Sequence, residues 1–130
     1  GMARRRKPDI IKTMKISDAL DVLGALAQPS RLAVFRYLIA TGPEGAPAGQ
    51  VATDLEVHVA TLSFHLNALK QAGLVHARRE SRQIIYSVNF ARMTDLIGFL
   101  TESCCTGQGE AARATATIRR ELRAIAGGRS

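Results

Sequence analysis

The segment between Gln50 and Asn89 constrains the fold of this chain more than any other part of it. It reads as two short helices, Gln50 to about Leu55 and Val59 to about Ala72, followed by two strand-like runs around a basic turn. Leucines recur along the second helix at the spacing of one buried face, and Gly73 stands where a left-handed residue commonly ends a helix. This succession predicts a winged helix-turn-helix, a mainly α fold with a small β-hairpin.

The expected hairpin has a polar, cationic tip. Its strands carry apolar residues in the two-residue alternation of a half-buried strand: Val75, Ala77, Ile84, Tyr86 and Val88. Between them, Arg78 to Gln83 forms the tip and is rich in arginine. Such a hairpin is typical of a wing that lies along a polyanion.

Two further helices are expected before this segment. Ser17 is placed to cap the first of them. The shared face of that helix holds Leu20, Leu23 and Ala27. Pro29-Ser30 starts the second helix, and Thr41-Gly42-Pro43 ends it. Its inward side chains are expected to be Leu32, Phe35, Leu38 and Ile39. The Pro- and Gly-containing stretch from Pro43 to Gly49 is expected to be a loop.

The chain after the hairpin predicts two more helices. Phe90 to about Ser103 carries large apolar residues along one side: Met93, Leu96, Ile97, Phe99 and Leu100. These are more than an intramolecular core needs, which suggests an interface. Glu110 to Ile125 reads as a second helix that ends at Gly127-Gly128. We therefore divide the chain into a basic, flexible arm (1–15), a winged-helix domain (16–105) and a helical extension (106–130).

Composition limits the class of protein. The chain has 130 residues, with 18 Lys and Arg against 11 Asp and Glu, a formal charge of +7 and a pI near 10.3. This excess favours a polyanionic partner. No apolar run is long enough to span a membrane, so we expect a cytoplasmic protein with free thiols. The sequence has no Cys-x-x-Cys spacing, no nucleophile paired with a nearby base and no phosphate-binding glycine loop, so an enzyme is not expected.

The polar face of the second helix of the pair suits a DNA major groove. On a helical wheel, short or flat side chains fall opposite the leucines, with no acidic group among them: Ala60, Ser63, Phe64, Asn67 and Gln71. Asn67 can pair with an adenine edge, Ser63 can bond either base, and Ala60 or Phe64 can meet a thymine methyl. For Phe64 the alternative is packing against its own subunit. The cations of the wing, and Lys70, are interpreted as phosphate contacts. The wing cation Arg82 can alternatively enter the minor groove.

Together, four motifs resemble those of the ArsR/SmtB family of winged-helix repressors. They are 25–32 (ALAQPSRL), 62–69 (LSFHLNAL), 72–75 (AGLV) and 82–87 (RQIIYS). The resemblance implies a homodimer, joined through the first and the post-wing helices, that binds an imperfect palindrome and releases it when an effector binds. The expected DNA contacts are Val59, Ala60, Thr61, Ser63, Phe64, Asn67, Lys70, Arg78, Arg79, Arg82 and Gln83.

Two histidines belong to this region. His58 stands where relatives in this family commonly carry a Ser or Asn helix cap, so the cap is an open question. His65 matches the family's His-Leu pair and lies at the edge of the buried face. For His65 we expect a structural hydrogen bond rather than a base contact.

Cys104 and Cys105 form the candidate effector site. They follow the post-wing helix directly, and thiolates select soft ions. A pair at this place resembles the family's trivalent arsenic and antimony sensors, so As(III) or Sb(III) is the expected regulatory ligand, with no permanent cofactor. Those relatives often have a third cysteine several residues later, which 107–116 lacks.

Other readings of the cysteine pair stay open. Zinc fits less well because only His58, His65 and His76 remain as further ligands, and all three fall in the DNA-binding half. A thiol redox switch, another soft metal and two inert cysteines are the remaining alternatives. An effector-independent DNA-packaging protein is the rival to a repressor.

Overall fold

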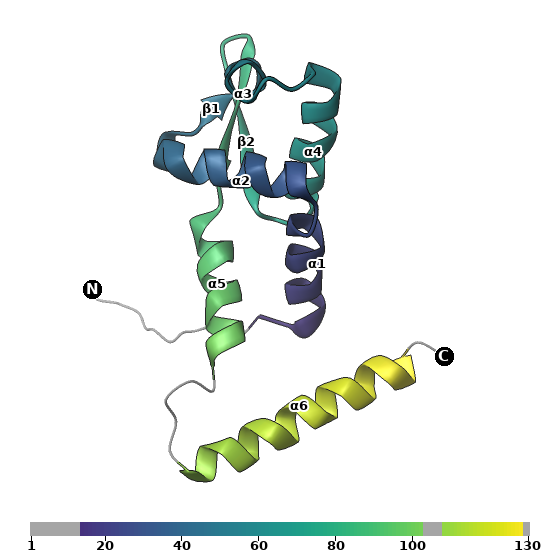
Figure 1. Cartoon of the computed structure of the whole chain (residues 1–130). Coiled ribbons are helices and arrows are strands. Elements are labelled where there is room, and N and C mark those ends of the chain that lie inside the picture. Colours follow the sequence, from purple (N-terminus) through teal and green to yellow (C-terminus); the bar gives the residue numbers. More distant parts are fainter. Residues whose placement is uncertain (1–13, 103–107, 129–130) are drawn as a thin grey trace, which may run out of the picture.

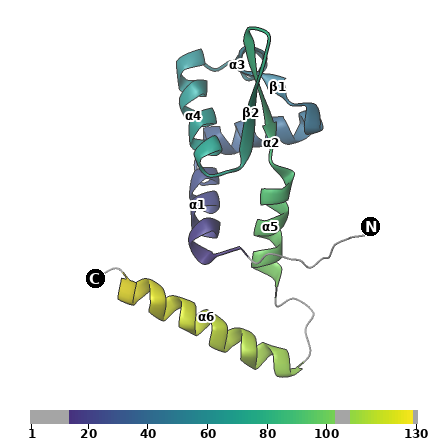
Figure 2. The ribbon, with the colours of Figure 1, turned by 180° about the vertical axis from the view of Figure 1, so that it is seen from behind.

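The computed structural model describes residues 14–102 and 108–128 (Figure 1; the view from behind is Figure 2). The elements in chain order are α1 (Ile16–Leu26), α2 (Pro29–Thr41), the 3-10 turn η2 (Gly42–Glu44), β1 (Ala46–Pro47), α3 (Ala48–Leu55), α4 (Val59–Gln71), β2 (Val75–Glu80), β3 (Gln83–Val88), α5 (Phe90–Thr101) and α6 (Gln108–Gly128). The predicted winged helix-turn-helix is confirmed. No helix in the described ranges is long and apolar enough to cross a membrane.

The start of α1 differs from the prediction. The helix begins at Ile16 after Lys15, whose side chain makes no capping hydrogen bond, so Ser17 lies within the first turn and is not the cap. Inside the protomer α1 buries Ala19 and Val22. The predicted apolar face is left in solvent instead, with Leu20 53% and Leu23 39% exposed.

Helix α2 begins and ends where the sequence predicts. Pro29 occupies its first turn, and the Gln28 side chain accepts a hydrogen bond from the Arg31 N–H at 2.7 Å. Phe35 and Leu38 are buried as expected, but Leu32 is 42% exposed. Val34, which was not among the predicted inward residues, is buried at 1% exposure.

The segment after α2 is more ordered than the predicted loop. It makes the turn η2 and then β1, which pairs antiparallel with β3 through Ala46 opposite Tyr86 and Pro47 opposite Ile85. The sheet therefore has three strands in the order β1-β3-β2. A two-residue strand has no periodicity of its own, because only pairing with β3 defines it.

The hairpin has the predicted position, and Val75 and Val88 at its base are buried as expected, but burial near the tip differs from the prediction. Strands β2 and β3 pair from Val75 opposite Val88 to Glu80 opposite Gln83, around a two-residue turn in which Ser81 has φ 58°. Ile85 is buried to 7% exposure, whereas the expected Ile84 is 39% exposed. One face of the sheet near the tip has no helix against it, so alternation along the strand alone does not predict burial there.

The core is built mainly from α1, α2, α3, α4 and the base of the wing. Its fully buried side chains are Leu38, Leu62, Leu66, Leu69, Leu74, Val22, Val34 and Val51. Gly73 ends the α4 region with φ 81°, as predicted, and Leu74 N–H then bonds to the Leu69 carbonyl at 2.9 Å. The leucine face of α4 is thereby fixed against the body, and its opposite face is left outward.

Helix α5 is tied to the end of α4 by Asn89. The Asn89 side chain accepts from the Arg92 N–H at 3.2 Å and donates to the Gly73 carbonyl at 3.0 Å. Leu96 is buried, and Met93 and Phe99 pack against the core. The last helix, α6, starts before the predicted Glu110 and includes Gly127 and Gly128, which were expected to end it.

Candidate nucleic-acid interface

The outward face of α4 carries the residues expected to meet DNA. Ser63, Asn67 and Gln71 are exposed, and Phe64 is 66% exposed. Val59, Ala60, Thr61 and Lys70 are exposed as well. The first turn of the helix has no acidic residue. This face therefore offers hydrogen-bonding and apolar groups, with no carboxylate to repel a phosphate backbone.

His58 does cap α4. Its Nδ1 accepts a hydrogen bond from the Ala60 N–H at 3.1 Å, which satisfies one of the free amides of the first turn. The imidazole thus takes the role that Ser or Asn commonly has at such a position. The cap holds the N-terminal end of α4, the end that enters a groove in helix-turn-helix proteins.

Phe64 lies on the exposed side of α4, and His65 lies on its buried side. The Phe64 ring lies edge-on to the His65 ring, with 5.7 Å between their centroids, and most of it remains in solvent. His65 is buried at 7% exposure, and burial, followed by the charge of Arg31, lowers its pKa. Its Nδ1 has no hydrogen-bond partner among the described residues, so the structural hydrogen bond expected there is not seen.

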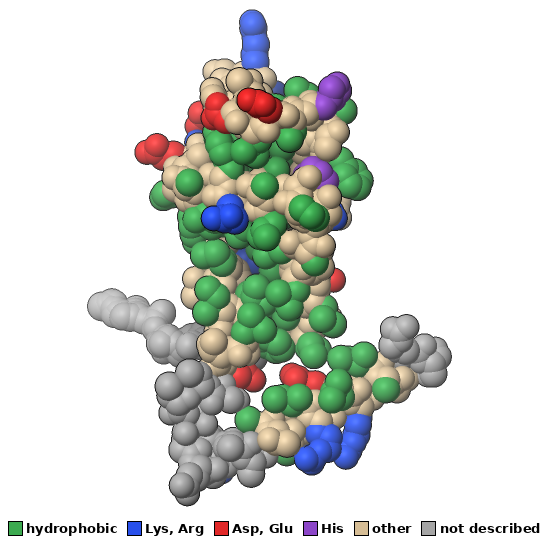
Figure 3. Space-filling model, viewed as in Figure 1, with side chains coloured by type: hydrophobic (Ala, Val, Ile, Leu, Met, Phe, Trp, Pro, Cys, Tyr) green, Lys and Arg blue, Asp and Glu red, His purple; other side chains and the backbone are tan. Residues whose placement is uncertain are grey.

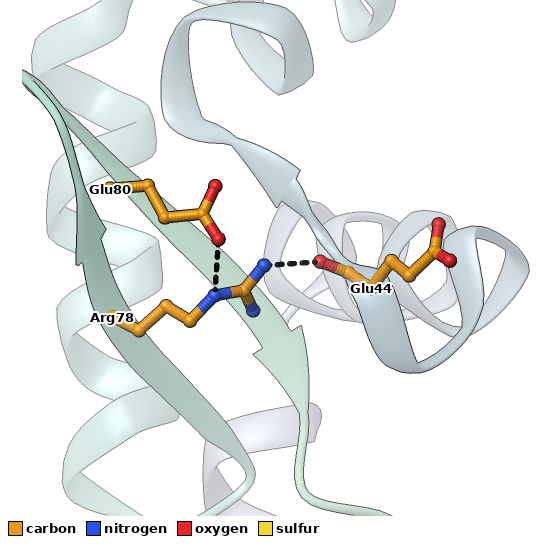
Figure 4. A network of polar contacts seen from close by, with 3 residues as sticks. All are labelled: Glu44, Arg78 and Glu80. Carbon is orange, nitrogen blue, oxygen red and sulfur yellow. Dashed lines mark hydrogen bonds and ion pairs between the residues drawn. The ribbon is translucent and has the colours of Figure 1, made fainter.

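One of the wing arginines, Arg78, is bound within the protomer, whereas Arg79 and Arg82 have no ion pair among the described residues. Arg78 Nε lies 3.0 Å from Glu80 Oε2, and Arg78 Nη2 donates to the Glu44 carbonyl at 3.3 Å (Figure 4). Arg78 therefore joins the wing to the turn before β1. Arg79, Arg82 and Gln83 are exposed at the tip, and neither arginine has an ion pair within the described part of the chain. They are the wing groups best placed for phosphate.

One polar cluster was not predicted from the sequence. The Tyr37 hydroxyl donates to Asp54 Oδ2 at 2.5 Å, and Gln50 Nε2 donates to Asp54 Oδ1 at 2.8 Å. The Asp54 carboxylate raises the pKa of Tyr37. Because Tyr37 is on α2, its bond to Asp54 holds α3 against α2, while the Gln50 bond within α3 orients the Asp54 carboxylate. The four-residue spacing of Gln50 and Asp54 was a visible signal.

A second surface is apolar. Leu20 and Leu23 on α1, and Ile97 and Leu100 on α5, are between 39% and 58% exposed; we call these four residues the α1–α5 apolar face. Figure 3 shows hydrophobic side chains gathered over the part of the body where α1 and α5 run side by side. On α6, Ile118 and Leu122 are 54% and 62% exposed. Large side chains grouped in this way are typical of an interface.

The candidate effector residues Cys104 and Cys105 lie outside the described residues. Within 14–102 and 108–128 no group of three or more His, Cys, Asp and Glu side chains is arranged to hold a metal ion. His58, His65 and His76 are therefore not assembled into a metal site.

A helix-turn-helix with a basic wing and an outward, acid-free second helix defines a DNA-binding regulator rather than an enzyme. Comparison with known proteins agrees, since a family described as a helix-turn-helix domain matches residues 26–78. A biofilm growth-associated repressor of Agrobacterium fabrum is 34% identical over 85 residues, which are 65% of this chain and 69% of the relative.

Solved structures extend the similarity. An ArsR-like transcriptional regulator from Rhodococcus sp. has a TM-score of 0.61 at 27% identity, over 85% of this chain and 91% of that one. The homodimeric winged helix-turn-helix domain of a possible ArsR-family regulator from Mycobacterium bovis is 31% identical with a TM-score of 0.54, over 68% and 82%. The chain belongs to the ArsR family of winged helix-turn-helix transcriptional regulators.

Proposed function

We propose that this protein is a homodimeric repressor that holds a two-fold operator with its paired α4 helices. The observation that carries the proposal is the exposed face of α4, where Ser63, Phe64 and Asn67 stand outward on a helix whose other side is buried. In a dimer the two such helices would be about one DNA turn apart, roughly 34 Å, which calls for a palindromic site. Arg79, Arg82 and Lys70 would contact the phosphates on either side.

The α1–α5 apolar face supports the dimer. Its four aliphatic side chains are 39% to 58% exposed in the described protomer. Burial of exposed aliphatic surface stabilises association by roughly 25 cal/mol for each Å². The homodimeric neighbour from Mycobacterium bovis has the same winged-helix fold. Two copies joined through this face would leave both α4 helices free.

The direct test replaces Asn67 with Ala. An operator is first selected from random duplexes by the protein itself, and affinities for it and for a random duplex are then measured by fluorescence anisotropy. Loss of a bidentate base contact costs about 1 to 3 kcal/mol, so each protomer should lose roughly 5- to 150-fold in operator affinity. Affinity for the random duplex should be unchanged.

The control for this test is Thr94→Ala, which removes an exposed polar side chain from α5 and should change neither affinity. An equal loss on both duplexes for Asn67→Ala would show that Asn67 contacts the backbone only. If the unmodified protein preferred no sequence at all, it would be a packaging protein and not an operator-specific repressor.

The same proposal includes an effector, As(III) or Sb(III), bound by Cys104 and Cys105. The support is chemical: two adjacent thiols are soft ligands, and their place in the chain is shortly after Thr101, where α5 ends. Two sulfurs drawn onto one metalloid would constrain the chain beside a helix that carries half of the α1–α5 apolar face. Ligand binding would thus act on the dimer and, through it, on the spacing of the α4 helices.

Titration with arsenite tests the effector. Arsenite should weaken operator binding of the unmodified protein by about 5- to 150-fold, the usual range of allosteric coupling. The variant with Cys104→Ser and Cys105→Ser should bind the operator with the affinity of the unmodified protein, and arsenite should not change that affinity. If both proteins lost affinity equally, the cysteines would not be the site. Release by a thiol oxidant but not by arsenite would identify a redox switch instead.

A further inference from the structure

A shallow cavity of about 480 Å³, widely open to solvent, lies between α1, the start of α2 and the end of α4. Asp21 contributes to its wall from α1, Arg31 from α2 and Gln71 from α4. The cavity thus lies between α1, which carries half of the α1–α5 apolar face, and α4, the helix proposed to read DNA. Neither the base contacts of α4 nor the phosphate contacts of the wing use this cavity.

Arg31 has no acceptor for its buried nitrogen. Its Nε is out of contact with solvent and makes no hydrogen bond to any described residue. The backbone N–H of Arg31 bonds to Gln28, so the unsatisfied atom is the side-chain Nε and not the helix end. A buried guanidinium nitrogen without a partner is costly and requires an explanation, and an absent ligand or water is one such explanation.

Gln71 links the Arg31 cavity to the surface of α4 that is proposed to contact DNA. Gln71 is exposed on the same outward side of α4 as Asn67, and it also lines the cavity. The cavity therefore continues the α4 face at the end of the helix farthest from the His58 cap. In B-DNA a phosphate backbone runs along each edge of the groove in which such a helix lies.

The charges around the cavity favour an anion over a cation as its ligand. Arg31 stands in the first turn of the 13-residue helix α2, where the helix dipole adds positive potential. Its charge also lowers the pKa of the neighbouring His65, after the larger effect of burial. The opposing group is the Asp21 carboxylate, which is exposed and forms no ion pair with Arg31 in the described structure.

We infer that the Arg31 cavity binds a phosphate oxyanion, and that this phosphate belongs to the DNA backbone beside the groove occupied by α4. Arginine suits such a site because its planar guanidinium can bond two phosphate oxygens at once. Gln71 is placed to donate to the same phosphate from α4. Contact here would anchor the α1–α2 junction to DNA, between the reading helix and the dimer face. The inference rests on the proposed DNA-binding function.

The test measures how DNA affinity depends on salt for the full chain and for Arg31→Gln. A mixed-sequence duplex of about 30 base pairs is sufficient, because a phosphate contact carries no sequence preference. Each phosphate contact adds about 0.9 to the slope of log K against log salt, so a dimer that loses two should show a slope smaller by about 1.8. Affinity near 0.1 M salt should fall roughly 10-fold or more.

Two further variants make the result specific. Arg36→Gln removes the same charge from the same helix at an exposed position away from the cavity, and it should leave the slope nearly unchanged. Asp21→Asn removes the repelling carboxylate and should tighten binding by about 2- to 5-fold at low salt, which no loss of folding can mimic. Thermal unfolding in the absence of DNA reports whether Arg31→Gln is folded.

Several results would overturn the inference. Equal changes in slope for Arg31→Gln and Arg36→Gln would show that the salt dependence reflects only the net charge of the protein. Weaker binding by Asp21→Asn would contradict the anion site. If inorganic phosphate raised the Tm of the unmodified protein but not of Arg31→Gln, and the DNA slopes were equal, the site would take a free anion instead of a DNA phosphate. Failure of the unmodified protein to bind any duplex would refute the proposed function itself.

Discussion

The variant with Ile97→Glu and Leu100→Glu is expected to be a folded monomer that has lost most of its affinity for the operator. Both side chains are more than half exposed in the protomer, at 53% and 58%, so their replacement should cost little folding stability. In the dimer they would place four carboxylates in an apolar interface, where unpaired charge is strongly unfavourable.

Loss of the dimer should have a large effect on DNA binding. Two linked reading helices raise affinity by about 10²- to 10⁴-fold over one, and a monomer forfeits that gain. Light scattering after size exclusion gives the mass, and anisotropy on the selected operator gives the affinity. Leu32→Gln is the control, because Leu32 is an exposed aliphatic residue on α2 outside the α1–α5 apolar face, and a neutral replacement adds no negative charge beside Arg31.

The result also decides what α6 does. If the double variant remained a dimer with normal operator affinity, the α1–α5 apolar face would not be the interface. The next candidate would be the exposed pair on α6, and Ile118→Glu with Leu122→Glu would then be expected to dissociate the protein. Dissociation by the α5 variant would show that α6 alone does not hold the dimer together.

Gly45→Ala is expected to destabilise the fold by about 3 kcal/mol or more. Gly45 has φ 74° and ψ −161°, a conformation that essentially only glycine adopts. A methyl group there would also overlap the Tyr86 carbonyl and approach the Ser87 Cβ to 2.8 Å. Relief of this overlap requires β1 to move away from β3, which removes the third strand of the sheet.

Gly42 provides a matched control for that prediction. Its backbone is nearly the same, with φ 74° and ψ −165°, but a Cβ there would meet nothing within 4 Å. Gly42→Ala should therefore show the conformational strain alone, about 1 to 2 kcal/mol. Chemical denaturation of both variants separates strain from steric overlap. Equal losses would mean that the approach of Gly45 to β3 does not matter for stability.

Several features of the fold could be predicted because they depend on neighbours close in sequence. The leucine spacing of α4 gave its buried side, and with it the outward position of Phe64 and Asn67. Pro29 and Gly73 marked helix boundaries because their backbone preferences are intrinsic to the residue. The histidine cap, in contrast, was an open question until His58 Nδ1 was seen to accept from Ala60.

Errors arose where a residue's environment is made by distant segments. Leu20, Leu23 and Leu32 are as apolar as the buried leucines, yet other elements cover them only in part in the protomer. Ile84 and Ile85 are the same residue type, and only the packing behind β3 makes one buried and the other exposed. The wing arginines are alike in sequence, but Glu44 and Glu80 engage Arg78 alone.

The sequence by itself determined the class of fold, the outward face of α4 and the basic wing, since helical periodicity and backbone preference act over a few residues. Tertiary structure decided which apolar side chains remain uncovered, which arginine is already paired, and that Arg31 lines a cavity beside α4 with a nitrogen that nothing in the described protomer satisfies. These properties depend on contacts between elements far apart in the chain, and no local pattern records such contacts.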